Sequence, residues 1–170
     1  MSLGYGTVGW EEFFVCAGGA TAVLSGLIFV ALSINIEKVL KIEKRDGQNF
    51  LTGRALEGLV DLLIVLGVSL VALTPEIARG VMAAVILLAA AASAVSPIRA
   101  LIASRGQSGL GTATLVRIET AGALTITLAA AGLTLAVHHG GGLYWLPAAF
   151  VLAITIAAVN AWVLLADVLR

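Results

Sequence analysis

Long stretches of sequence without a charged residue constrain this chain more than any other feature. The run from Phe13 to Ile36 contains no Asp, Glu, Lys or Arg, and similar runs follow at Gly80–Ile98, Thr120–Val137 and Gly140–Ala166. A helix crosses a bilayer core of about 30 Å with about 20 apolar residues, so these runs are suited to spanning a membrane. Charged residues make up only 12% of the 170-residue chain, whereas soluble domains contain about a quarter. The runs therefore predict a polytopic membrane protein.

A fifth apolar run, Leu62–Thr74, reaches only about 20 Å as a helix at 1.5 Å per residue. To cross the bilayer, this helix must begin near Ala55, which draws Asp61 and Glu57 into the membrane. The alternative is a re-entrant hairpin, whose irregular backbone is costly where it meets lipid. We expect an all-α bundle of five transmembrane helices that forms one membrane domain over residues 1–170. The expected helices cover approximately residues 12–44, 54–74, 76–103, 114–138 and 143–168.

The basic residues predict how this bundle is oriented. In the five-span arrangement nine of the ten Lys and Arg residues fall on one side, and only Arg79 falls on the other. Because basic residues gather in cytoplasmic loops, we expect the N-terminus outside and the C-terminus in the cytoplasm. The formal net charge of zero gives no reason to expect a nucleic-acid partner.

Polar residues at the start of the second helix are the strongest candidates for a functional site. Arg54, Glu57 and Asp61 follow one another at spacings of three and four, which places them on one helical face. Two ionised carboxylates one turn apart repel, so in a low-dielectric setting one must find a cation or take up a proton. The same half of the bundle is expected to hold the possible cations Arg99 and Arg117, together with Glu119, Asn35 and Asn160.

This polar cluster has two interpretations. It is either a salt-bridged clamp that locks the cytoplasmic end of the bundle, or a proton or cation site that opens to the cytoplasm.

Small residues in the first helix also have two interpretations. Gly18, Ala22 and Gly26 recur every four residues and let helix backbones approach closely, either within the subunit or at an interface between subunits.

Other motifs are weak. The segment Gly4–Gly9 matches the G-x-G-x-x-G string of dinucleotide-binding folds, but no strand precedes it and a membrane helix follows it. We therefore expect a flexible N-terminal segment, and a flexible turn at His138–Gly142. The adjacent His138 and His139 make a poor metal site. We expect no metal, no cofactor and no catalytic residues, and we do not expect an enzyme.

Three segments of the first two helices carry a family resemblance. The segments Trp10–Phe14, Gly26–Asn35 and Gly53–Glu57 resemble a group of small bacterial integral membrane proteins of unknown function, some of which are labelled as modulators of a membrane protease. The resemblance implies a multi-pass protein of the bacterial inner membrane. It also implies that Asn35, Arg54 and Glu57 lie at the cytoplasmic ends of neighbouring helices, and it assigns no catalytic residue.

Two functions follow from these features. The first is a non-enzymatic membrane protein that acts by association in the lipid bilayer, as a homo-oligomer or as an accessory subunit of a membrane-protein complex. Its support is the small-residue helix face and the short outer loops. The alternative is an oligomeric ion or proton channel or transporter that uses Glu57 and Asp61.

Overall fold

The structure, a computed structural model of the chain, describes residues 4–46, 50–104 and 112–168. Within these ranges the backbone alone is described for residues 38–46, 50–52, 54–55, 103–104, 112–114 and 163–168. Every regular element of this part of the chain is helical, as the sequence predicts. The elements are α1 (Glu11–Asp46), α2 (Phe50–Ala72), α3 (Arg79–Ser93), α4 (Val95–Ser104), α5 (Thr112–Val137), the short 3-10 helix η1 (Gly142–Trp145) and α6 (Leu146–Val168).

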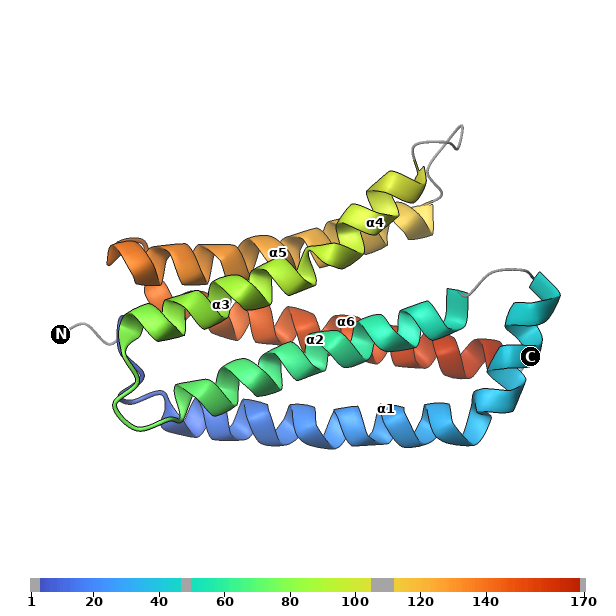
Figure 1. Cartoon of the computed structure of the whole chain (residues 1–170), viewed down its shortest axis with the longest axis horizontal. Coiled ribbons are helices and arrows are strands. Elements are labelled where there is room, and N and C mark those ends of the chain that lie inside the picture. Colours follow the sequence, from blue (N-terminus) through green and yellow to red (C-terminus); the bar gives the residue numbers. More distant parts are fainter. Residues whose placement is uncertain (1–3, 47–49, 105–111, 169–170) are drawn as a thin grey trace.

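The long helices lie side by side and alternate in direction, so that the chain passes along the bundle five times (Figure 1). Helix α2 packs against α1, α3 and α6, while α5 packs against α3, α4 and α6. The end of α4 and the start of α5 lie at the same end of the bundle as the start of α2. Arg99 on α4 and Arg117 on α5 therefore belong to that end, and Arg79 at the start of α3 belongs to the opposite end.

Four helical stretches of the described residues are long and apolar enough to cross a membrane. They are Glu11–Glu37, Arg79–Ile102, Leu115–Val137 and Gly142–Trp162. Helix α2 is not among them, but it is continuous over 23 residues and begins at Phe50, ahead of Ala55. This continuity contradicts the re-entrant hairpin as the structure of the second apolar segment.

The third helix differs from the uninterrupted helix expected over residues 76–103. It starts later, at Arg79, and it breaks at Ala94 between α3 and α4. Pro97 explains the break, because it has no N–H to offer the carbonyl of Ser93 and its ring crowds the preceding turn. The resulting bend between α3 and α4 is visible in Figure 1.

The N-terminal segment contacts the end of α5 and the start of η1. The carbonyl of Gly4 accepts a hydrogen bond of 2.7 Å from the N–H of Leu143. The ring of Tyr5 stacks on His138 with a centroid separation of 5.4 Å. Glycines 140–142 all have positive φ, a conformation that residues with a Cβ rarely adopt, which explains why glycine occupies all three positions of this turn.

Candidate functional site

Glu57 on α2 is held by side chains from two other elements. Arg117 on α5 donates to its carboxylate through both Nη2 and Nε, and the Nε···Oε2 distance is 3.1 Å. Ser96 on α4 donates to Oε1 at 2.8 Å. A guanidinium that uses two nitrogens fixes the orientation of a carboxylate as well as balancing its charge. Glu57 is therefore neutralised and tied to α4 and α5.

Two serines on either side of the break between α3 and α4 belong to this site. Ser96 lies in the first turn of α4, next to Pro97, and bonds to Glu57. Ser93 is the last residue of α3, and its Oγ lies 3.0 Å from the Oγ1 of Thr125 on α5. Both serines line the cavities beside α2. Two hydroxyl groups of an otherwise alanine-rich segment thus lie next to the acidic face of α2.

Asp61 lies one turn after Glu57 and has a different environment. Its carboxylate makes no hydrogen bond and no ion pair with any residue that the structure describes. It is partly buried and lines two cavities. An ionised carboxylate in such a place is costly unless a proton or a cation compensates its charge.

The two cavities meet at the acidic face of α2. The larger, about 390 Å³, lies between α2 and the α3–α4 bend and is also lined by Arg99. The smaller, about 180 Å³, extends toward α5 and α6, where Thr120 and the buried Asn160 line it. Since one water molecule takes about 30 Å³ in the liquid, even the smaller cavity has room for several.

Among the described site residues, only one of the two carboxylates has a cation within bonding distance. Glu57 and Asp61 carry two negative charges when both are ionised, while Arg117 supplies one positive charge within bonding distance. Arg99 lines the larger cavity, but it is exposed and makes no ion pair with the described residues. The arrangement can accept one further positive charge beside Asp61, with hydroxyl oxygens nearby.

The structure brings together five of the residues predicted for the polar cluster, namely Glu57, Asp61, Arg99, Arg117 and Asn160. Two others lie elsewhere: Glu119 is exposed and lines neither cavity, and Asn35 lines a separate groove beside α1. The side chain of Arg54 lies outside the described residues.

The serines of the kinked helix were not predicted from the sequence. Ser93 and Ser96 are isolated polar residues in an apolar helix, at a spacing of three ahead of Arg99. That spacing marks one helical face, so the pattern held a usable signal for them.

The small-residue face of α1 divides between two environments. Gly18 is buried, and a Cβ added there would meet the Cβ of Ser69 on α2 at 3.3 Å, so this glycine serves packing within the chain. Ala22 is exposed, and a Cβ at Gly26 would meet no atom within 4 Å. The face that the sequence predicts therefore packs inside the chain at Gly18 and is open at Ala22 and Gly26.

Comparison with protein-family models, with curated proteins and with solved structures found no match to this chain.

Proposed function

We propose that the chain is a five-span protein of a bacterial inner membrane, with α2 as the additional span, the N-terminus outside and the C-terminus in the cytoplasm. At about 35 Å, the 23 residues of α2 are long enough to cross a bilayer core. It packs against α1, α3 and α6, and the large side chains that it leaves exposed, such as Leu56, Leu63 and Leu70, are apolar and suited to lipid. The nine-to-one division of basic residues between the two ends supports the orientation.

Within this arrangement, we propose that Asp61 reversibly binds a proton or a small monovalent cation as part of an ion- or proton-translocating function. The observation that carries the proposal is the contrast between two carboxylates one turn apart. Glu57 is neutralised by Arg117, whereas Asp61 faces two cavities without a hydrogen-bond or ion-pair partner among the described residues. Ionisable groups inside a membrane most often mark a transport path or a proton relay.

Flux measurements in proteoliposomes test this proposal. We expect the wild-type protein to dissipate an imposed proton, sodium or potassium gradient, and Asp61→Asn to reduce the flux to that of protein-free vesicles. The asparagine keeps the size of the side chain but removes its charge. Glu119→Gln is the matched control, because Glu119 is acidic but lines neither cavity, and its flux should equal that of the wild type. Absence of flux from the wild type, or full flux from Asp61→Asn, would contradict the proposal.

Association in the membrane is the second candidate function, and the outward face of α1 favours it. Ala22 is exposed, and neither Gly19 nor Gly26 has an atom within 4 Å of the position of an added Cβ. Small residues are enriched where transmembrane helices approach closely, because they let the backbones come together. This face can receive a helix of a second copy or of a larger membrane complex, such as a membrane protease.

Size measurements in mild detergent test the association. We expect the wild-type protein to migrate as an oligomer or with a co-purifying chain, and Gly26→Leu to release it as a monomer. Gly80→Leu on α3 is the control, because Gly80 also has no atom within 4 Å of an added Cβ. A wild-type protein that is monomeric and free of partners would rule out this function.

A further inference from the structure

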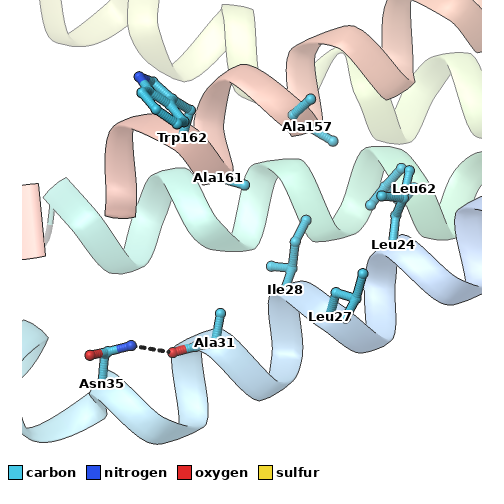
Figure 2. A pocket seen from close by; sticks show the side chains of 10 residues that line it. Leu24, Leu27, Ile28, Ala31, Asn35, Leu62, Ala157, Ala161 and Trp162 are labelled. Atoms are coloured by element: carbon cyan, nitrogen blue, oxygen red, sulfur yellow. Dashed lines mark hydrogen bonds between the residues drawn. The ribbon is translucent and has the colours of Figure 1, made fainter. Parts of the chain in front are cut away.

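A groove separate from the acidic site runs between α1 and α6. Its volume is about 350 Å³, and its floor includes the fully buried Leu62 of α2. Figure 2 shows its walls: Ile28 and Ala31 on α1 face Ala157 and Ala161 on α6. The lining is almost entirely apolar, and Asp61 does not contribute to it.

The length of the groove matches one leaflet of a bilayer. On α1 it begins at Leu24, the middle of the apolar stretch Glu11–Glu37, and it ends at Asn35 near the end of that stretch. These positions are about 16 Å apart along a helix, which is close to half of a hydrocarbon core of about 30 Å. On α6 the lining residues also lie in the last part of the stretch Gly142–Trp162. Both walls therefore cover the same half of the membrane.

The groove is narrower than a helix. The centres of water-sized groups can occupy about 350 Å³ along about 16 Å, which corresponds to a groove about 8 Å wide once the radius of such a group is added. An extended acyl chain fits within this width. A helix with side chains has a diameter of about 10–12 Å and is too wide to enter. The shape therefore favours an acyl chain over a helix of a second copy.

Among the described lining residues, polar side chains lie only at the end of the groove that corresponds to the membrane surface. There, Asn35 donates from Nδ2 to the carbonyl of Ala31 at 2.9 Å, and Figure 2 shows Trp162 across from it on α6. Trp162 is 72% exposed, and tryptophan is enriched at the level of lipid headgroups. The opposite end of the groove, at Leu24 and Leu62, is apolar. The groove thus has the polarity of one lipid molecule, with a headgroup end and a hydrocarbon end.

From this agreement in length, width and polarity, we propose that the groove binds one phospholipid of the leaflet at the Asn35 end. One acyl chain lies along Leu24–Ala31 against α6, and the headgroup lies beside Asn35 and Trp162. The proposal requires only that the bundle sits in a membrane. It does not depend on translocation through Asp61.

Native mass spectrometry of the whole protein tests this proposal. The protein is reconstituted in vesicles of phosphatidylethanolamine and phosphatidylglycerol, extracted in mild detergent, and examined for bound phospholipid. We expect one phospholipid per wild-type chain and about tenfold weaker retention by Ala158→Phe. The phenyl ring would displace part of the acyl chain, and loss of burial of only two of the chain's methylene groups weakens binding by about that factor. Ala158 is exposed and lines the groove, so a larger side chain there fills the groove without entering the core.

Ala148→Phe is the matched control, because Ala148 is also an exposed alanine of α6 but lies outside the groove. It should retain the phospholipid as the wild type does, and both variants should keep the helical circular dichroism of the wild type. Equal retention by Ala158→Phe, or a wild type that retains no phospholipid, would overturn the proposal. A lipid-free wild-type dimer that Ala158→Phe dissociates would assign the groove to a second copy instead.

Discussion

Replacing Gly132 with leucine is expected to destabilise the folded protein by about 3 kcal/mol, at the upper end of the usual effect of overpacking. Gly132 lies on α5 where this helix packs against α3. An added Cβ would lie 2.7 Å from Cγ of Leu87 and 3.2 Å from its backbone nitrogen. Rotation of the Leu87 side chain cannot remove the contact with the backbone, so α3 and α5 must move apart. Unfolding in mixed detergent micelles, followed by circular dichroism, measures the loss.

Gly122→Leu on the same helix is the control for this prediction. An added Cβ at Gly122 meets no atom within 4 Å, so its free energy of unfolding should change by less than about 1 kcal/mol. Gly132→Ala should also destabilise, but by less than leucine, and Leu87→Ala in the same chain should restore part of the loss. Equal stability of Gly132→Leu and Gly122→Leu would show that α3 and α5 do not approach as closely as the structure has them.

The helical architecture was largely predictable from the sequence, because uninterrupted apolar runs can satisfy the backbone in lipid mainly as helices. The alternation of apolar runs and turn segments in the sequence predicted the five passes along the bundle. The break at Ala94 was not expected, although Pro97 carried the signal for it. The contact between the N-terminal segment and η1 could not be predicted, because its hydrogen bond joins Gly4 to Leu143, far apart in the sequence.

The candidate site was predictable in part, and helix geometry explains the difference. The spacing of Glu57 and Asp61 fixes their common face whatever the other helices do. The spacing does not say which arginine pairs with Glu57, because Arg99 and Arg117 both lie toward the same end of the bundle. The rotation of each helix about its axis decides between them, and packing sets that rotation. The rotation of α1 also explains why Asn35 lies in the same half of the bundle as the acidic site but lines a different groove.

Arg117→Met is expected to destabilise the protein by about 2–3 kcal/mol, because it leaves the Glu57 carboxylate with only Ser96 as a described donor. The exposed fractions of the Arg117 and Glu57 side chains are 30% and 21%, so the pair is only partly buried and the loss stays below that of a fully buried pair. Arg117→Lys should recover only part of the stability, since an ammonium group cannot reproduce the two-nitrogen contact. Unfolding in mixed micelles at neutral pH measures all three proteins.

The partner variant Glu57→Gln separates the ion pair from the general effect of losing an arginine. If the pair stabilises the bundle, Glu57→Gln combined with Arg117→Met should be less destabilised than the two single changes added together, with a coupling free energy of about 1–2 kcal/mol. Arg99→Met is the matched control, because Arg99 is exposed and makes no ion pair with the described residues, and it should change the stability by less than about 0.5 kcal/mol. Strict additivity of Glu57→Gln and Arg117→Met would contradict the clamp.

The Glu57→Gln protein also separates the roles of the two carboxylates in the proteoliposome measurement. If Glu57→Gln retains ion or proton flux while Asp61→Asn has none, the Glu57–Arg117 pair holds the helices together and Asp61 carries the translocated charge.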